Sequence, residues 1–313
     1  MIKEEFYFDS RDGENRIHAV RYTPDDGNVR GIVQIVHGMA EYVERYENLA
    51  EFLTKRGILV TGEDHLGHGK SVSEGGSFGY FCEQDPATVV VRDVHRLKKI
   101  TEEQYPQVPY IILGHSMGSF IARNYLCRYG SGIGGAVIVG TGMQPAGLIF
   151  ASKAMAGIQK LFCGSKHVSH FMDKAAFGGY NKRIDSPRTS SDWLSRNTEN
   201  VDRYIEDELC GFTFTVNGFQ TLFELIRRLQ KQENLEKVPQ NLPILMISGA
   251  EDPVGDYGKG VHKACDSLKR AGVKNITVKL YENDRHELLN EDDAEVAMED
   301  IWQWICKEIP GIA

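Results

Sequence analysis

The stretch that decides the fold is YIILGHSMGSFIARNYLCRY, residues 110–129. It begins with the apolar run Tyr110–Leu113, whose length and Ile content predict a buried strand. It ends with Met117–Tyr129, which we interpret as a helix. Between the two lies Gly114-His-Ser-Met-Gly118, a G-x-S-x-G pattern that places Ser116 on a sharp strand-to-helix turn. We therefore expect an exposed Ser116 hydroxyl next to a helix N-terminus that favours negative charge.

Strands and helices alternate on both sides of this turn. Strands are expected at Glu4–Phe8, Ile17–Tyr22, Gly31–His37, Ile58–Thr61, Tyr110–Leu113, Ala136–Val139, Leu242–Ser248 and Ile276–Tyr281. Helices are expected at Glu41–Arg56, Ala87–Tyr105, Met117–Tyr129, Gly258–Ala271 and Ala294–Glu308. This alternation predicts an α/β fold with a mostly parallel sheet and helices on both of its faces. The first two strands are expected to be antiparallel, joined by a turn at Asp9–Asn15.

The alternation stops between Thr141 and about Asn241, where helix-like and loop-like sequence predominates. We predict a core formed by residues 1–140 and 242–313, and an insert of residues 141–241 over one edge of the sheet. Two stretches of the insert carry apolar residues at helical spacing. These residues are Leu148, Ala151, Met155, Ile158 and Phe162 in one stretch, and Phe219, Leu222, Phe223, Ile226 and Leu229 in the other.

The composition excludes several classes of protein. The 36 Lys and Arg residues and 44 Asp and Glu residues give a net charge of −8, without the basic face that a nucleic-acid-binding protein needs. No apolar run is long enough to span a membrane. The N-terminal residues MIKEEFYFDS do not resemble a signal peptide. The six Cys residues are scattered without a CxxC pair, which is typical of reduced thiols, and we expect a cytoplasmic protein. Oligomeric state cannot be inferred from these features.

Two residues far along the chain are candidates to activate Ser116. Asp252 and His286 each follow a predicted strand, so all three side chains are expected at the carboxyl ends of strands, where an open α/β sheet binds ligands. The order Ser, Asp, His is the one found for a triad on this kind of sheet. A histidine base takes the serine proton, and the carboxylate orients the imidazole. Glu251 and Asp256 are rival acids close to Asp252.

An oxyanion hole needs two backbone N–H groups directed at the developing charge. One is expected from Met117, the residue after the nucleophile. The other is expected from Met39, because His37-Gly38 directly follows a predicted strand.

The chain resembles α/β-hydrolases of the monoacylglycerol lipase and lysophospholipase group. The motifs that carry the resemblance are His37-Gly38-Met39-Ala40-Glu41, Asp64-His65-Leu66-Gly67-His68-Gly69-Lys70-Ser71, GHSMG at 114–118, Glu251-Asp252-Pro253-Val254-Gly255, and Arg285-His286-Glu287 with Asn290-Glu291. The resemblance covers nearly the whole chain outside the insert. It implies a serine esterase without metal or cofactor, and an insert that forms a cap over the active site.

Some positions depart from the pattern of the group or invite another interpretation. Met39-Ala40 replaces the Ala-Gly of the mammalian monoacylglycerol lipases, and Ser119 stands where a third Gly is common, which affects the expected shape of the acyl pocket. The resemblance implies that Asp64 binds backbone amides in a structural loop and, with its neighbouring histidines, does not bind metal. His115 is expected to be a hydrogen-bonded core residue and not a second base.

We therefore expect hydrolysis of monoacyl esters such as monoacylglycerols or lysophospholipids. Met155, Ile158, Phe219 and Phe223 are candidate substrate-binding residues in the cap, although such apolar stripes more commonly pack the cap on the core.

Three alternatives stay open. A short-chain or aryl carboxylesterase would use the same triad. An aminopeptidase would need a carboxylate in the cap for the substrate amine, for which Glu206, Asp207 and Glu208 are candidates. A non-catalytic binder of the same fold would not have an activated serine.

Overall fold

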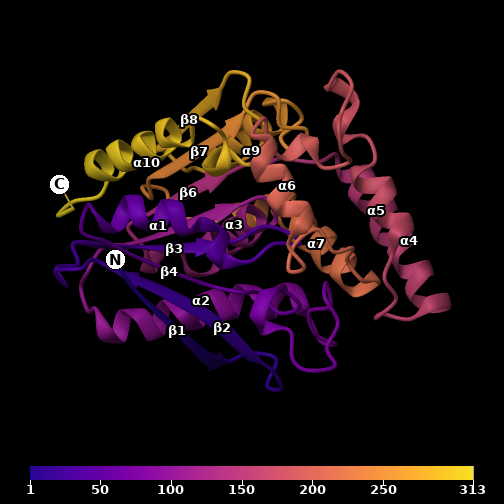
Figure 1. Ribbon diagram of the computed structural model, residues 1–313, viewed down its shortest axis with the longest axis horizontal. Helices are drawn as coiled ribbons and strands as arrows, with labels where there is room; N and C mark the ends of the chain where they lie inside the picture. Colours follow the sequence, from indigo (N-terminus) through magenta and orange to yellow (C-terminus); the bar gives the residue numbers. More distant parts are fainter. Residues whose placement is uncertain (313) are drawn as a thin grey trace.

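The computed structural model describes residues 1–312 and contains one eight-stranded sheet (Figure 1). Its strands are β1 Ile2–Asp9, β2 Arg16–Thr23, β3 Gly31–Val36, β4 Ile58–Glu63, β5 Tyr110–His115, β6 Gly135–Val139, β7 Ile244–Gly249 and β8 Ile276–Tyr281. They lie in the order β1-β2-β4-β3-β5-β6-β7-β8. The β1–β2 and β2–β4 pairs are antiparallel and the others are parallel. The predicted α/β class and the antiparallel first pair are confirmed.

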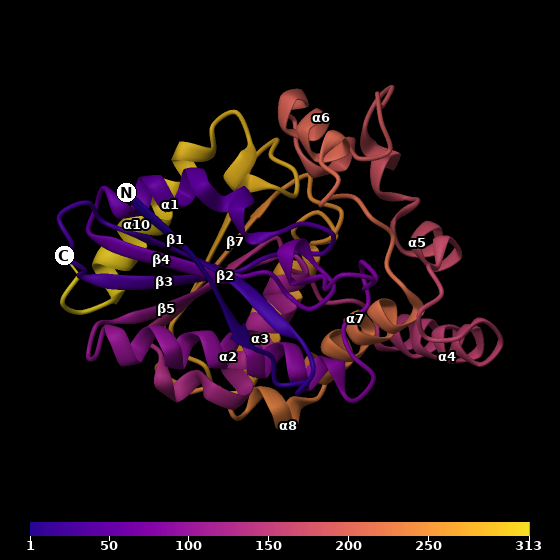
Figure 2. The same cartoon turned by 60° about the horizontal axis from the view of Figure 1, so that its bottom comes forward.

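Helices cover both faces of the sheet (Figure 2). The helices of residues 1–312 are α1 Glu47–Thr54, α2 Pro86–Gln104, α3 Met117–Tyr129, α4 Ala146–Cys163, α5 His170–Phe177, α6 Thr198–Glu206, α7 Val216–Leu229, α8 Gln232–Leu235, α9 Lys259–Arg270 and α10 Ala294–Glu308. Successive residues of a strand face opposite sides, so Val33 and Ile35 of β3 pack with α1 and α10. Ile32 and Val36 pack with α2, α3 and α9. Burial on both faces explains why these strands are apolar without alternation.

The helix expected at Glu41–Arg56 begins later than predicted. Val43–Tyr46 forms a 3-10 turn, and α1 begins only at Glu47. Ala40 has a φ of 54°, in the left-handed region, and the Glu41 side chain accepts a hydrogen bond from the Gly38 amide. The chain is therefore still in a tight turn at the residues where the periodicity predicts a helix.

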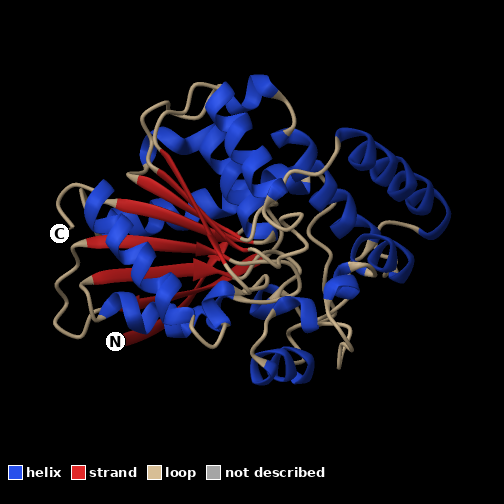
Figure 3. Cartoon of the chain, turned by 90° about the horizontal axis from the view of Figure 1, so that it is seen from above, coloured by secondary structure: helices blue, strands red, loops and turns tan. Residues whose placement is uncertain are grey.

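The insert (residues 141–241) connects β6 to β7 and contains α4 to α8. In Figure 3, helices lie beyond one end of the strands, and Figure 1 identifies α4 and α5 of the insert on that side. Helix α7 packs on α3 of the core, and α4 packs on α7. Among residues 1–312, no helix is long and apolar enough to cross a membrane.

Candidate active site

Ser116 occupies a strained turn between β5 and α3. Its φ of 54° and ψ of −123° lie in a region that residues with a side chain rarely adopt. The two flanking glycines make the turn possible. A Cβ on Gly118 would lie 1.9 Å from the Val36 carbonyl oxygen, and one on Gly114 would lie 2.4 Å from the Gly118 carbonyl oxygen. The backbone approaches of this turn therefore require glycine at both ends of the G-x-S-x-G pattern.

Asp252 and His286 form a buried pair. Asp252 follows β7, His286 follows β8, and the His286 Nδ1 lies 3.0 Å from the Asp252 Oδ2. The same carboxylate accepts hydrogen bonds from the Ser248 hydroxyl (3.1 Å) and the Val254 amide (2.8 Å), which fix its orientation. Because Nδ1 is used by the carboxylate, Nε2 is the ring nitrogen left for a reacting group. The rival acids near Asp252 are exposed at the surface.

His286 lies directly beside the Ser116 turn. The rings of His286 and His115 are 4.7 Å apart, and the His115 Nε2 lies 3.2 Å from the His286 carbonyl oxygen. A Cβ on Gly140 would lie 3.1 Å from the His286 Cε1, so the residue after β6 also packs against the ring. The structure thus places the Asp252–His286 pair next to the residue that precedes Ser116.

The turn that follows β3 lies close to Ser116. A Cβ on Gly38 would lie 3.1 Å from the Ser116 Cβ and 2.5 Å from the Glu41 Oε1. The Gly38 amide donates a 2.5 Å hydrogen bond to that Glu41 oxygen, which holds the turn in place. The backbone of Met39 follows this close approach, and Met117 follows Ser116, so both expected oxyanion donors belong to segments in contact with the serine.

A buried charge network supports this turn. Arg45 forms a 2.8 Å ion pair with Glu41 and a bidentate pair with Glu287, with both distances 2.8 Å. Tyr46 donates its hydroxyl to Glu41, and the His115 Nδ1 lies 3.3 Å from the same carboxylate. Burial alone would raise the pKa of Glu41, but the His115 hydrogen bond and the Arg45 charge hold it well below its usual range. Although burial opposes it, the Glu41 carboxylate raises the pKa of His115.

The sequence analysis missed this network. Glu41 belongs to the His37–Glu41 motif, and Arg45 follows it four residues later, so their spacing is a usable signal. Glu287 lies more than two hundred residues away, and only the fold shows that it faces Arg45. As expected, His115 is a buried, hydrogen-bonded residue.

Ser119 lies behind the serine turn. It is buried, its hydroxyl donates to the Ser116 carbonyl (2.5 Å), and its oxygen lies 2.8 Å from the Thr141 hydroxyl oxygen. Arg123, one turn further along α3, donates to the Gly142 carbonyl at 3.0 Å. Burial lowers the pKa of Arg123 to about 10. The Gly-to-Ser departure at this position therefore affects the support of the serine turn.

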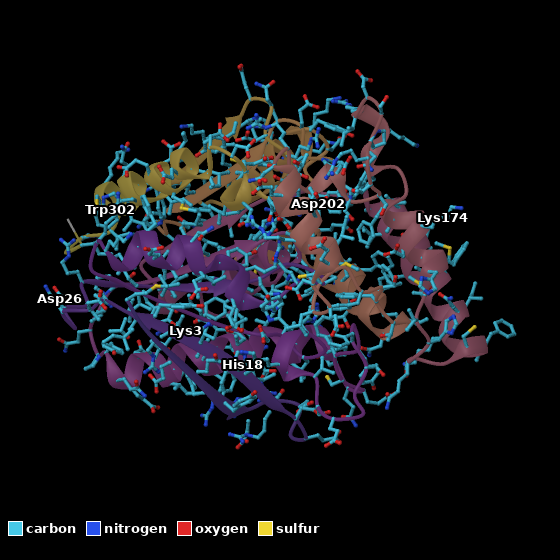
Figure 4. All side chains as sticks on the ribbon, viewed as in Figure 1. Lys3, His18, Asp26, Lys174, Asp202 and Trp302 are labelled. Carbon is cyan, nitrogen blue, oxygen red and sulfur yellow. The ribbon has the colours of Figure 1, made fainter. Side chains whose placement is uncertain are left out.

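Asp64 holds a structural loop, as the resemblance implies. Its carboxylate accepts hydrogen bonds from the amides of Val43 (2.9 Å) and Lys70 (2.8 Å) and lies 2.8 Å from the His18 Nδ1. His18, labelled in Figure 4, belongs to β2, well away from α4 and α5.

One group of side chains within residues 1–312 has the spacing of metal ligands: Glu5, His18 and Glu44. The Lys70 ammonium group already binds both carboxylates, at 2.7 Å and 2.9 Å. The Lys3 ammonium group also pairs with Glu44, so cations of the protein itself offset the charge of both carboxylates.

The four candidate substrate-binding residues occupy different surroundings. Phe219 and Phe223 of α7 are buried, and the Phe219 ring lies 6.4 Å from that of Phe177 on α5. Met155 is half-buried on α4. Ile158, on the other hand, is 62% exposed on the outer side of α4, so the structure does not bring it together with the other three. Trp193, which the sequence analysis did not select, lies with its ring 5.1 Å from that of His286.

The family model described as "Serine aminopeptidase, S33" matches residues 27–293. The chain belongs to this family. Together with its relatives, this makes it an α/β-hydrolase of the monoacylglycerol lipase type and an ester hydrolase.

Relatives cover nearly the full length of the hydrolase. The rat monoglyceride lipase is 29% identical over 87% of this chain and 80% of its own length. The Mycolicibacterium smegmatis monoacylglycerol lipase is 27% identical over 92% of each chain. The crystal structure of a highly thermostable carboxyl esterase from Bacillus coagulans, in complex with glycerol, has a TM-score of 0.92 and 31% identity, and covers all of both chains.

Proposed function

We propose that Ser116, His286 and Asp252 form the catalytic triad of this ester hydrolase. The observation that carries the proposal is the strained Ser116 turn, next to a buried Asp252–His286 pair with a 3.0 Å hydrogen bond. The His286 Nε2 takes the Ser116 proton while the oxygen attacks the ester carbonyl. Asp252 keeps the proton on Nδ1 and stabilises the imidazolium that forms. The backbone N–H groups of Met39 and Met117 bind the oxyanion.

The same groups complete the reaction. The protonated His286 gives its proton to the leaving alcohol, and the acyl group stays on Ser116. A water molecule then attacks the acyl-enzyme, with His286 again as the base, and releases the acid.

The preferred substrates are monoacyl esters of medium or long chain, monoacylglycerols or lysophospholipids. The names of the rat and mycobacterial relatives support this class. Two features of the insert support it further. Aromatic rings in contact lead from Phe219 of α7 through Phe177, Tyr180 and Trp193 to His286, and they form a wall that is suited to an acyl chain. The insert (residues 141–241) acts as the cap, and α4 presents an apolar outer face to the solvent.

A short-chain or aryl carboxylesterase is the second candidate. It is favoured by the Bacillus coagulans carboxyl esterase, which matches this chain from end to end. The aminopeptidase alternative, which the family description names, has less support in the insert. The Asp207 carboxylate already accepts hydrogen bonds from the Tyr42 hydroxyl and the Leu209 amide, and Glu206 and Glu208 are exposed.

The test is hydrolysis of p-nitrophenyl esters from C2 to C16, with a monoacylglycerol, a lysophosphatidylcholine and an aminoacyl anilide alongside. Wild type is compared with Ser116→Ala, for which we expect a loss of about 10⁴-fold or more. An optimum at C8 or longer with glycerol release supports the lipase. An optimum at C2–C4 without lipid turnover identifies the small-ester carboxylesterase, and Ser116→Ala with most of its activity left would overturn the triad.

A further inference from the structure

The loop that carries His286 is bound to one segment of the insert. We define the His286 loop as residues 282–293, between β8 and α10, and the tether segment as residues 192–200. The tether segment contains the 3-10 turn Asp192–Leu194 and the start of α6. Figure 2 shows α6 beside the yellow loops near the C-terminal end of the chain.

The neighbours of His286 on both sides make hydrogen bonds to the tether segment. The Glu287 amide donates to the Leu194 carbonyl at 2.7 Å. The Arg285 guanidinium donates to the Asp192 carbonyl, also at 2.7 Å. Both bonds end on backbone oxygens of the tether segment, so they hold the backbone of that segment against the His286 loop. The backbone position of His286 therefore depends on contacts outside its own loop.

Glu291 is the residue that joins the two segments most extensively. Its buried side chain accepts the Arg285 amide on Oε1 (2.9 Å), which closes the His286 loop on itself. Its Oε2 accepts the Ser195 hydroxyl (2.7 Å) and the Arg196 amide (2.8 Å) of the tether segment. Hydrogen bonds to a buried carboxylate are stronger than neutral ones, and leaving such donors unpaired is costly. One carboxylate thus holds the loop and the segment in a fixed relation.

The tether segment also forms one wall around the imidazole. Trp193 lies in the 3-10 turn of this segment, with its ring 5.1 Å from the His286 ring. A substitution that shifts the tether segment would therefore move the backbone of His286 and change the packing of its ring.

We propose that Glu291 is a positioning residue that holds His286 in its catalytic geometry by joining the His286 loop to the tether segment. The inference rests on the proposed function, because it requires His286 to be the base. It assigns to this part of the insert a role in the chemical step of every ester, and not only in substrate binding.

The test compares Glu291→Gln with a matched control, Glu282→Gln, which changes an exposed carboxylate of the same loop. In Glu291→Gln, an amide group would point its own N–H bonds at donors. We expect kcat to fall by about 10- to 100-fold, because small displacements of a catalytic group have effects of this size. KM is expected to change little, and the factor should be equal for a C4 and a C12 ester. Glu282→Gln should behave as wild type.

Ser195→Ala keeps the test decisive if Glu291→Gln does not fold. It removes one donor to Glu291 and should lower kcat in the same chain-length-independent way, by a smaller factor. An unchanged kcat in the folded variants would overturn the inference, as would a loss that grows with acyl length, since the segment would then shape the acyl pocket. If Ser116→Ala is inactive while these variants keep wild-type kcat, only this inference fails and the triad stands.

Discussion

Two buried carboxyl groups near the serine turn differ in charge because their neighbours differ. Glu41 has the cations Arg45 and His115 beside it, and these outweigh the effect of burial on its pKa. Glu63, at the end of β4, accepts a hydrogen bond from the neutral Gln34 amide, at 3.1 Å. Burial raises the pKa of Glu63 to about 8, and the nearby Asp93 carboxyl group adds to the effect. Glu41 is therefore part of an ionic network, whereas Glu63 is a neutral acid in the folded protein at pH 7.

This difference predicts how stability depends on pH. Glu63 binds a proton more tightly folded than unfolded, so its stabilisation is complete below its ordinary pKa of 4.5 and is lost as the pH rises through about 8. Glu63→Gln mimics the protonated acid and should remove this loss. The variant should be more stable than wild type at pH 9, by an amount on the order of a few kcal/mol, and nearer to wild type at pH 6. Urea denaturation at both pH values measures the difference, and a constant difference would contradict the assignment.

Local sequence identified the candidate triad, but not the residues that support it. Ser116 has a pattern within five residues, and Asp252 and His286 follow apolar strands in a known chain order. The Glu41–Arg45–Glu287 network and the Glu291 contacts join segments that are distant in sequence. Nothing in one sequence says which charged groups will meet after folding, so these partners appear only in the structure.

At the scale of elements, the serine turn depends on the close approach of α3 to β3. Gly118→Ala should prevent the fold or destabilise it severely, because the new methyl group would overlap the Val36 carbonyl. Gly157→Ala is the control in another helix. A Cβ at Gly157 in α4 has nothing within 4 Å, so alanine should stabilise the protein by about 0.5–1 kcal/mol through helix propensity alone. Thermal unfolding of both variants checks the pair, and a well-folded, active Gly118→Ala would show that the turn is looser than described.

Apolar periodicity predicted two helices of the insert, α4 and α7, but not the direction in which each faces. The stripe on α7 is buried against the core, as expected for packing. The stripe on α4 mostly faces the solvent: Leu148, Ile158 and Phe162 are exposed and Met155 is half-buried. The helix packs inward through Ile149 and Ala156, which lie outside the stripe. Because α4 is apolar on both sides, its pattern does not indicate which face meets the protein.

At the scale of the whole molecule, α4 and α5 lie furthest from the sheet, and their outer side is open to solvent (Figures 1 and 4). Phe150, Leu161 and Phe162 are each at least three-quarters exposed. Contiguous exposed apolar surface of this kind marks an interaction site. For the monoacyl ester substrates that we propose, this face is suited to contact with dispersed or micellar substrate.

The double change Phe150→Ser and Phe162→Ser tests that role. Both side chains are exposed, so the free energy of unfolding should change by less than about 1 kcal/mol. Activity on a micellar long-chain monoacylglycerol should fall several-fold, because less apolar surface meets the micelle, while kcat/KM for a dissolved C4 ester should stay at the wild-type value. Equal losses on both substrates would point to damage at the active site and not to a surface effect.

The central claim is that Ser116 is a nucleophile activated by His286 and Asp252. The most direct measurement is reaction of wild type with a fluorophosphonate probe, followed by mass spectrometry of the intact protein and its peptides. We predict one adduct, on Ser116, with labelling that is much slower in His286→Ala and absent in Ser116→Ala. A wild-type protein that stays unlabelled, or carries the adduct on another residue, would contradict the account.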